Sequence, residues 1–363
     1  MKILFTTRYF GGADGVGRYS VEIVKLLMKK HDVEVLTSKA DVIIPGLHYK
    51  FIKIPTKPFL FWELLFTLRS SWFVFRNKKN YDVVHTQKTE TLGGDIVTMH
   101  SCHRAGIETR NDQDKSFLKK ILRKFWPLNI LRLFVEKRVI KKAKIIVAVS
   151  RGVRAEIKKF YGRRNIEVVF NGVDTDMFSP GVSSIKKELK IPENKNVLLF
   201  VGNGYISKGL NFVIDSLKYL GKDFHLVIVG RDSWVPEGDN ISVESDINST
   251  DIHLYYKAAD CFVFPSLYEA FPLVVLESLS TGVPVVAANV NGVTDCIDDG
   301  VNGHIIERKG IDIAFGIKKI FRDKNILKKY KENSRATAME FTWEKTLDKL
   351  ELLYESINNN TNI

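Results

Sequence analysis

The stretch CFVFPSLYEAFPLVVLE, residues 261–277, reads as a short strand, a polar loop and the beginning of a helix. Cys261–Phe264 is a continuous apolar run that ends at Pro265, which is typical of a parallel strand buried on both faces. Pro272 has a fixed φ and no backbone N–H, so we expect it to be the first residue of the following helix. Strand, loop and helix in this order form the repeating unit of doubly wound α/β sheets.

The same alternation extends from this stretch in both directions. In the first half we expect strands at Lys2–Thr7, Val33–Thr37, Asp82–His85, Ile96–Met99 and Lys144–Val149. In the second half we expect them at Val197–Val201, His225–Val229, Cys261–Phe264, Val283–Ala287 and His304–Ile306. Segments with helical periodicity separate these runs, which indicates parallel sheets with helices on both faces.

A stretch rich in Pro, Gly and Ser, residues 176–184, separates the two halves and is predicted to be a linker. The fold class is therefore α/β with two doubly wound, Rossmann-like domains, at residues 1–178 and 179–340. Residues 341–363 contain an amphipathic helix from Trp343 to Ile357. Ligands of such sheets bind beyond the carboxyl ends of the strands, so we expect the active site in a cleft where two sheets face each other.

Composition narrows the class of protein. Apolar residues make up 45% of the 363 residues, and the formal charge is +13. Residues 1–180 hold 34 basic and 17 acidic residues, a charge of +17, so the remainder carries 13 − 17 = −4. The basic half suggests nucleic acid, an anionic membrane or an anionic substrate as partner. Three cysteines, no CxxC and no apolar run of signal-peptide length at the start predict a reduced, cytoplasmic protein.

Two glutamates and a helix N-terminus form the first candidate site. The N–H groups of Phe271, Leu273 and Val274 would bind a diphosphate at the beginning of the predicted helix. Glu269 lies on the preceding loop, where it would face a sugar. Glu277 lies one to two turns inside the helix, where it would bind ribose hydroxyls. The alternative is that both glutamates are solvated surface charges.

The spacing of these glutamates, E-x7-E within PSLYEAFPLVVLESL and before GVPVV, resembles the donor-site signature of the retaining glycosyltransferases of family 4, which have the GT-B fold. Five further stretches resemble family motifs: GVGRY at 15–19, VAVS at 147–150, NGVD at 171–174, FVGNGYISKG at 200–209 and FTW at 341–343. The resemblance implies transfer of a hexose from a UDP- or GDP-linked donor to a glycan or lipid-linked acceptor, with retention of configuration. It also implies cell-surface polysaccharide or glycolipid synthesis, an acceptor-side first domain and a last helix that returns to it.

The resemblance assigns further residues to the site. Lys208 would neutralise the departing diphosphate, and His100 would line the sugar site, so both join Glu269 as catalytic candidates. Gly15 belongs to the first glycine loop of the donor site. Asn203 stands where many members have an arginine, a change for which Arg231 or Arg18 is a candidate substitute.

No cofactor or metal is expected. The glycine loop lacks the GxGxxG spacing of a dinucleotide fingerprint, and no acidic residue ends the second strand. No Asp-x-Asp motif stands at a strand end, and His100, His103 and His85 have no evident partner ligands. Helix dipoles, backbone N–H groups and lysine would meet the phosphate charge instead.

Two other classes remain as alternatives: a GT-B-fold nucleotide-sugar epimerase and a basic nucleic-acid-binding protein. The second lacks any recognisable nucleic-acid-binding module.

The segment FLKKILRKFW, residues 117–126, places its apolar residues on one helical face and four cations on the other. Such a helix suits an anionic membrane interface, and the alternative is a core helix with a solvated basic face. Leu60, Phe61, Trp62, Leu64, Leu65 and Phe66 form a second apolar patch. We expect peripheral attachment at the inner face of a membrane.

Overall fold

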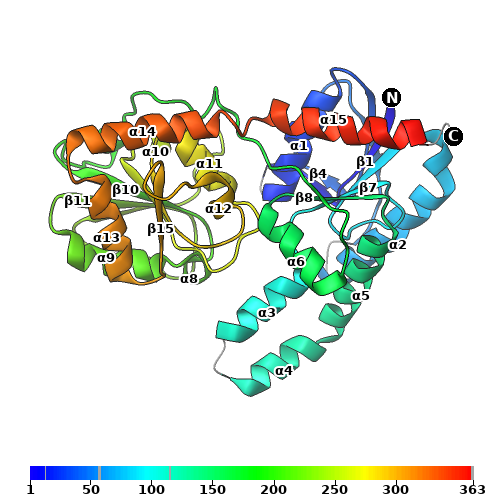
Figure 1. Cartoon of the computed structure of the whole chain (residues 1–363), viewed down its shortest axis with the longest axis horizontal. Coiled ribbons are helices and arrows are strands. Elements are labelled where there is room, and N and C mark those ends of the chain that lie inside the picture. The colour runs from blue at the N-terminus through cyan, green and yellow to red at the C-terminus, as the bar shows by residue number, and fades with distance from the viewer. Residues whose placement is uncertain (13, 56–58, 114–115, 361–363) are drawn as a thin grey trace. The chain divides into compact units, whose positions relative to one another are not determined.

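The computed structural model describes residues 1–12, 14–55, 59–113 and 116–360 (Figure 1). The side chains of residues 59–61, 113, 119, 124 and 360 are outside this description. Ala13 of the glycine loop, the Leu60 and Phe61 side chains of the apolar patch, and the Lys119 and Lys124 side chains therefore lie outside the described residues. The chain divides into two compact units, Met1–Asn171 with Trp343–Ile363, and Gly172–Thr342.

Unit 1 is built on a parallel seven-stranded sheet in the order β5-β3-β1-β6-β7-β8-β9. Its strands are β1 (Lys2–Thr6), β3 (Asp32–Thr37), β5 (His48–Phe51), β6 (Val83–Gln87), β7 (Ile96–Met99), β8 (Ile145–Ala148) and β9 (Glu167–Val168). A separate pair is formed by β2 (Tyr9–Phe10) and β4 (Lys39–Ala40). The central strands β1, β6 and β7 are almost wholly buried, as their continuous apolar runs predict.

The helices of unit 1 are α1 (Gly15–Leu27), α2 (Phe59–Asn77), α3 (His103–Gln113), α4 (Phe117–Phe125), α5 (Pro127–Lys142), α6 (Arg151–Tyr161) and α15 (Trp343–Asn360), with a 3₁₀ turn at Lys78–Asn80. Local signals explain several of their ends. Ser150 caps α6 by accepting a hydrogen bond from the Val153 N–H at 3.0 Å. Gly162 ends the same helix in the left-handed region, with φ of +68°.

The last helix, α15, belongs to unit 1, where it lies beside α1 (Figure 1). Tyr354 on α15 is fully buried, and its hydroxyl lies 2.7 Å from Nδ1 of His85 on strand β6. His85 Nε2 in turn lies 2.7 Å from the Thr98 hydroxyl on strand β7. His85 therefore ties the final helix to the centre of the sheet.

Unit 2 contains a parallel six-stranded sheet in the order β12-β11-β10-β13-β14-β15. Its strands are β10 (Asn196–Val201), β11 (Phe224–Val229), β12 (Ile241–Glu244), β13 (Cys261–Phe264), β14 (Val285–Ala288) and β15 (Gly303–Ile306). Its helices are α7 (Ile185–Glu188), α8 (Tyr205–Lys208), α9 (Leu210–Leu220), α10 (Ile252–Ala258), α11 (Leu273–Ser280), α12 (Val293–Cys296), α13 (Gly310–Ile320) and α14 (Lys324–Ala338). The two doubly wound sheets confirm the predicted fold class.

The boundary between the units differs from the predicted one, because residues 172–178 pack within unit 2. Phe178 is fully buried, and its ring centroid lies 5.7 Å from that of Tyr256. The Phe178 carbonyl accepts hydrogen bonds from the Ser280 hydroxyl at 2.6 Å and from Arg335 at 3.1 Å. Pro, Gly and Ser predicted a linker here, but a buried aromatic side chain anchors the segment.

The helix α4 exposes its apolar side chains, among them Phe117, Leu118, Leu122 and Phe125, which are 55–76% exposed. Arg123 on the same helix donates a hydrogen bond to Asn111 on α3 at 2.6 Å. The alternative of a core helix with a solvated basic face is therefore wrong for this segment. In the part of the chain that the structure describes, no helix is long and apolar enough to cross a membrane.

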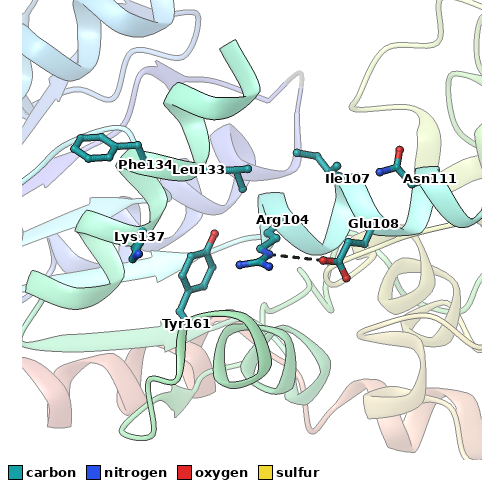
Figure 2. Close-up of a pocket in the computed structure, with 8 residues that line it drawn as sticks. All are labelled: Arg104, Ile107, Glu108, Asn111, Leu133, Phe134, Lys137 and Tyr161. Carbon is teal, nitrogen blue, oxygen red and sulfur yellow. Dashed lines mark ion pairs between the residues drawn. The ribbon is translucent and has the colours of Figure 1, made fainter. Parts of the chain in front are cut away.

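Helices α3, α5 and α6 of unit 1 surround a cavity of about 380 Å³ (Figure 2). Its lining combines apolar side chains from α3 and α5 with Arg104, Lys137 and Tyr161. No pattern in the sequence predicted it, since three helices separated in the chain supply its walls.

Candidate active site

The strand order of unit 2 reverses between β10 and β13, which pair directly in the middle of the sheet. Successive connections leave this point toward opposite edges, so the loops after β10 and β13 diverge above the sheet. Ligands of doubly wound sheets bind in the crevice that this divergence creates. Lys208 follows β10 and Glu269 follows β13, so both candidates belong to this position.

Lys208 and Glu269 form an ion pair between Lys208 Nζ and Glu269 Oε1. The Ser266 hydroxyl donates a hydrogen bond to the same carboxylate oxygen at 2.7 Å. Lys208 Nζ also lies over the Phe264 ring, 5.5 Å from its centroid. The side chains of Lys208 and Glu269 are only 28% and 15% exposed, so the reading of Glu269 as a solvated surface charge is excluded.

A glycine brings these two loops together. Gly209 follows Lys208 with φ of +81°, and a Cβ at this position would lie 2.3 Å from the Pro265 carbonyl oxygen. Any other residue would force the end of α8 away from the loop after β13. The Leu267 N–H donates to the Ser207 carbonyl at 2.9 Å and joins the same two segments. The geometry of Lys208 and Glu269 thus depends on backbone contact between neighbouring loops.

The helix after Glu269 begins one residue later than expected. Pro272 is the N-cap residue of α11, with extended backbone (φ −79°, ψ 109°), and Leu273 is the first helical residue. The Pro272 carbonyl already accepts a hydrogen bond from the Val275 N–H at 3.2 Å. The N–H groups of Leu273 and Val274 belong to the first turn, whose donors have no acceptor within the helix. Donors in this position can bind an anion, and their use by a diphosphate stays a prediction.

Phe271 and the loop after β14 hold the beginning of α11 in place. The Phe271 ring is buried, with its centroid 6.2 Å from that of Phe341. Gly292 follows β14 with φ of +78°, and a Cβ there would lie 2.5 Å from the Phe271 Cα. This close approach requires glycine and fixes the direction in which the first turn of α11 points.

Glu277 lies in the second turn of α11 and is only 3% exposed. Its main-chain carbonyl accepts hydrogen bonds from Thr281, from the N–H at 3.1 Å and from the hydroxyl at 2.9 Å. Burial of a carboxylate is costly unless partners satisfy it, so a surface role is excluded for this residue as well. The sequence indicated this because Glu277 interrupts an otherwise apolar run.

Asn203 connects the loops after β10 and β11. Its side-chain oxygen accepts a hydrogen bond from the Arg231 N–H at 2.8 Å. The guanidinium of Arg231 forms an ion pair with Asp246, and its side chain is 68% exposed. Asp232 accepts a hydrogen bond from the Tyr205 N–H at 2.6 Å, at the beginning of α8. Asn203 therefore organises the loop backbone, while the Arg231 side chain is engaged with Asp246.

Gly15 is in unit 1, at the first position of α1, whereas the other donor-binding candidates are in unit 2. A Cβ at Gly15 would meet nothing within 4 Å, so open space surrounds this position. The Asp14 side chain accepts a hydrogen bond from the Gly17 N–H at 2.7 Å and caps the helix. This carboxylate occupies one donor of the helix N-terminus that a phosphate would otherwise use.

His100 follows β7 in unit 1 and is buried, with Nε2 2.8 Å from Oε1 of Gln87. Its ring meets the Tyr19 ring edge-on, with centroids 4.6 Å apart. Burial and the nearby Lys88 charge hold the pKa of His100 well below its usual value, so the imidazole is neutral near pH 7. His103 differs in role, because it begins α3 and its N–H donates to Glu136 at 2.7 Å.

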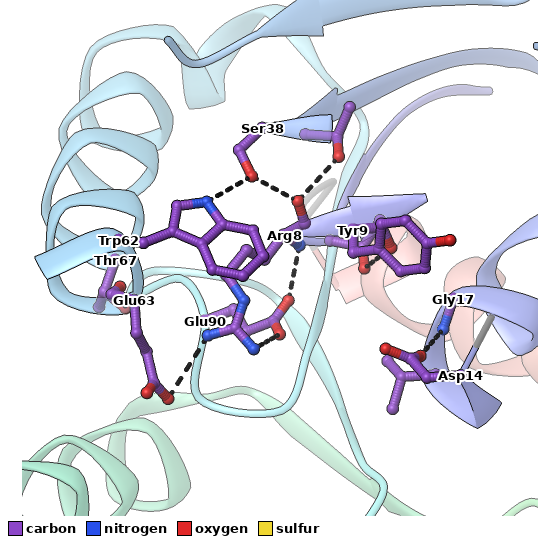
Figure 3. Close-up of polar contacts among 12 residues, drawn as sticks. Arg8, Tyr9, Asp14, Gly17, Ser38, Trp62, Glu63, Thr67 and Glu90 are labelled. Atoms are coloured by element: carbon purple, nitrogen blue, oxygen red, sulfur yellow. Dashed lines mark hydrogen bonds and ion pairs between the residues drawn. The ribbon is translucent and has the colours of Figure 1, made fainter. Parts of the chain in front are cut away.

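The sequence did not predict a charged network in unit 1 (Figure 3). It lies at the switch point of the sheet, the place between β1 and β6 where the strand order reverses. Arg8 follows β1, and Figure 3 shows it between Glu63 and Glu90. The guanidinium nitrogens of Arg8 lie 3.5 Å from Glu63 and 3.7 Å from Glu90. The main-chain N–H of Arg8 donates a hydrogen bond to the Glu90 carboxylate at 2.7 Å. The guanidinium also lies over Trp62, 5.0 Å from the ring centroid.

The signal that identifies this network is its position. Arg8 and Glu90 lie in the connections that follow two neighbouring strands of the sheet, as Lys208 and Glu269 do in unit 2. The sequence shows the strands but not which of them are adjacent, so Arg8 could not be singled out among many basic residues.

Comparisons with known proteins agree with this geometry. The family model "Glycosyltransferase Family 4" matches residues 13–177, and "Glycosyl transferases group 1" matches residues 182–337. The galactosyltransferase of Escherichia coli named UDP-Gal:alpha-D-GlcNAc-diphosphoundecaprenol alpha-1,3-galactosyltransferase is 27% identical over 313 residues, 78% of each chain. The D-inositol 3-phosphate glycosyltransferase of Xylanimonas cellulosilytica is 29% identical over 199 residues, 48% of each chain.

Solved structures share the fold along nearly the whole chain. Sucrose-phosphate synthase from Thermosynechococcus elongatus superposes with a TM-score of 0.81 at 19% identity and 98% coverage of both chains. Anabaena HepE in complex with UDP-glucose superposes with a TM-score of 0.73 at 17% identity, covering 98% of this chain and 100% of its own. The two family models together span both units, and the chain belongs to the family 4 glycosyltransferases, nucleotide-sugar-dependent enzymes of the GT-B fold.

Proposed function

We propose that this glycosyltransferase moves a hexose from a UDP-linked donor to a lipid-linked glycan acceptor, with retention of the anomeric configuration and without a metal ion. The observation that carries the proposal is the Lys208–Glu269 ion pair at the switch point of unit 2, where the loop that carries Glu269 leads on to the first turn of α11. A cation, a carboxylate and a helix N-terminus that follow neighbouring strands are the groups that a sugar diphosphate would need.

The donor diphosphate would bind at the N–H groups of Leu273 and Val274, where the partial positive charge of the helix N-terminus adds to that of Lys208. Lys208 would stabilise the negative charge that develops on the diphosphate as the glycosidic bond breaks. Glu269, held by Lys208 and Ser266, would bind the sugar hydroxyls. Glu277 would bind the ribose from its position in the second turn.

UDP is the preferred nucleotide in this proposal, and GDP is the alternative. The Escherichia coli relative is named for UDP-galactose, and HepE holds UDP-glucose on the same fold. Retention follows from the resemblance of residues 265–277 to the signature of retaining family members. In such a reaction the acceptor attacks from the face that the diphosphate leaves, with His100 proposed as part of the pocket wall.

A metal ion would be redundant in this scheme, because Lys208 and the main-chain N–H groups of Leu273 and Val274 would supply the positive charge that the diphosphate needs. Charge stabilisation by fixed dipoles and a lysine requires no reorganisation during the reaction. The proposal therefore includes no cofactor.

The acceptor side is proposed to work at the inner face of an anionic membrane. Large apolar side chains are exposed on α4 and the beginning of α5: Phe117, Leu118, Ile121, Leu122, Phe125, Trp126 and Ile130. Contiguous exposed apolar surface of this kind marks an interaction site, and the surplus of +17 in residues 1–180 favours an anionic partner. The E. coli relative, named for a diphosphoundecaprenol-linked acceptor, supports a lipid-linked substrate.

The donor assignment is tested by thermal-shift measurements of the full chain against a panel of UDP- and GDP-linked hexoses. A ligand at 100 times its dissociation constant stabilises the native state by about 2.7 kcal/mol. We expect a shift with a UDP-hexose that Glu277→Ala abolishes. The matched control, Glu193→Ala, changes an exposed glutamate before β10 and should keep the shift. A shift that survives Glu277→Ala unchanged would contradict the ribose assignment.

A further inference from the structure

The cavity between α3, α5 and α6 has the composition of an amphiphile site. Ile107, Leu133 and Phe134 supply apolar walls, and Arg104 and Lys137 supply two cations (Figure 2). Its volume of about 380 Å³ falls within the range of small-molecule sites. The Arg138 guanidinium lies over the Phe134 ring, 5.7 Å from its centroid, and adds a third positive charge nearby.

Two carboxylates lie at the cavity: Glu108 belongs to its lining, and Glu136, which contacts Tyr161, is occupied by structural contacts. Glu136 is buried, and its two oxygens accept hydrogen bonds from the His103 N–H at 2.7 Å and from the Arg104 N–H at 3.3 Å. The Tyr161 hydroxyl donates to the same carboxylate. Glu136 therefore caps α3 and holds Tyr161 in the cavity wall, so its charge is compensated before any ligand binds.

An apolar stripe on α5 leads to the cavity. Trp126, Ile130 and Phe134 follow one another at intervals of four residues, which places them along one helical face. They are 57%, 50% and 58% exposed, and the last of them lines the cavity. Helix α4 ends at Phe125, next to Trp126 in the chain, and it also exposes apolar side chains. Exposed apolar residues thus occur along α4 and α5 up to a cavity with cations at its wall.

We propose that this cavity binds the phosphate-proximal part of the acceptor's aliphatic chain, with the phosphate or diphosphate group at Arg104 and Lys137. The proposal rests on the proposed function, whose lipid-linked acceptor it deepens by locating the lipid. Charge complementarity supports the anionic end, and the apolar walls support the chain. The stripe of Trp126, Ile130 and Phe134 guides the remainder of the chain toward the membrane-facing surface of α4.

One ion pair must open for this binding. Arg104 Nε lies 3.6 Å from Glu108, and their side chains are 48% and 45% exposed. Exposed pairs of this kind contribute little to stability, so a phosphate that offers a stronger charged hydrogen bond displaces Glu108. Tyr161 lies between Lys137 and Arg104 (Figure 2). We expect Lys137 to bind the same anion from the other side of Tyr161.

Calorimetric titration of the full chain with geranyl diphosphate, without a donor, tests the site. We expect binding at least tenfold tighter than that of inorganic diphosphate or of geraniol, because only the complete amphiphile uses both the cations and the apolar walls. Leu133→Trp, which fills the cavity, and Lys137→Gln, which removes a cation, should each weaken binding at least tenfold. Two controls should bind as the wild type does: Leu352→Trp at an exposed position of α15, and Lys141→Gln at an exposed position of α5.

The outcomes separate the sources of the ligand and the two proposals. Equal binding by all four variants, or binding only to phosphatidylglycerol vesicles with no effect of Lys137→Gln, overturns the cavity as a chain site. Because Lys137 is exposed, its replacement tests the site even if Leu133→Trp fails to fold. Geranyl diphosphate binding that these variants weaken upholds the site even where no hexose transfer is detected, so a failure of the proposed function is recognised separately.

Discussion

Replacement of Lys208 by methionine is the sharpest test of the donor site, because it removes the charge and keeps most of the side-chain volume. Lys208 Nζ contacts Glu269, and both side chains are largely shielded from water. At an effective dielectric constant of 20, a unit charge 4 Å from another contributes about 4 kcal/mol. Loss of one preorganised donor to a developing negative charge typically costs about 10²- to 10³-fold in kcat. We expect a loss of this size.

The loss should appear in kcat more than in the KM for the donor. Lys208 is proposed to act on charge that grows as the diphosphate leaves, so its contribution is larger in the transition state than in the bound donor. Release of nucleoside diphosphate from the donor, with and without acceptor, measures both parameters. Lys218→Met is the matched control, because Lys218 pairs with Asp215 on the exposed face of α9 and its side chain is 73% exposed.

A double-mutant cycle with Glu269→Gln shows whether the pair acts as a unit. Residues in direct contact are coupled, so the combined variant should lose at least tenfold less activity than the product of the two single losses. Lys208→Met turning over at a rate within threefold of the wild type would refute the leaving-group role. Additive losses would refute the coupling that the ion pair implies.

Four other outcomes are expected. Turnover should survive EDTA, and a chelated enzyme restored only by manganese or magnesium would show that a metal bears the diphosphate charge. Proton NMR of the newly formed glycoside should show the anomeric configuration of the donor, whereas an inverted anomer would contradict the retaining mechanism. Flotation with anionic liposomes should be strong at 0.1 M salt and weak at 1 M, because the Debye length falls from about 10 to about 3 Å. The double variant Leu118→Gln, Leu122→Gln should no longer float, whereas the control Leu352→Gln should float as the wild type does. No flotation at low salt would contradict membrane attachment. Burial lowers the pKa of His85 to about 3, below its unfolded value of about 6.5, so the unfolded state gains the proton first. The free energy of unfolding should therefore fall by about 1.4 kcal/mol per pH unit between pH 6.5 and pH 3, and urea titrations in which His85→Gln leaves that slope unchanged would contradict this.

Local signals in the sequence located most of the strands that build the two sheets. Ile96–Met99 and Cys261–Phe264 have the bounds that continuous apolar runs predicted. The short strands β5, β9 and β12 of these sheets were missed, because each lies at a sheet edge, where burial leaves no continuous apolar run. Strand β14 begins at Val285 and not at Val283, because Pro284 between them has no N–H to donate.

The candidate residues of unit 2 were recognisable because a charged residue inside an apolar run is costly to bury without a purpose. Glu277 within VVLESL is the clearest case, and the structure buries it. The beginning of α11 was predicted one residue early, since Pro272 suits both the N-cap and the first helical position. The contact between Lys208 and Glu269 could not be read from the chain, because 61 residues separate them.

By itself, therefore, the sequence determined the class of the fold and the two large parallel sheets, since burial and backbone sterics leave local patterns along the chain. Only the tertiary structure decided which strands are neighbours, and with that which side chains meet at each switch point. It brought Arg8 to Glu90 across 82 positions and formed the cavity beside Arg104 from three separate helices. Only the tertiary structure showed that the apolar face of α4 is exposed. Periodicity predicts that a helix has an apolar face, but it does not predict what covers that face.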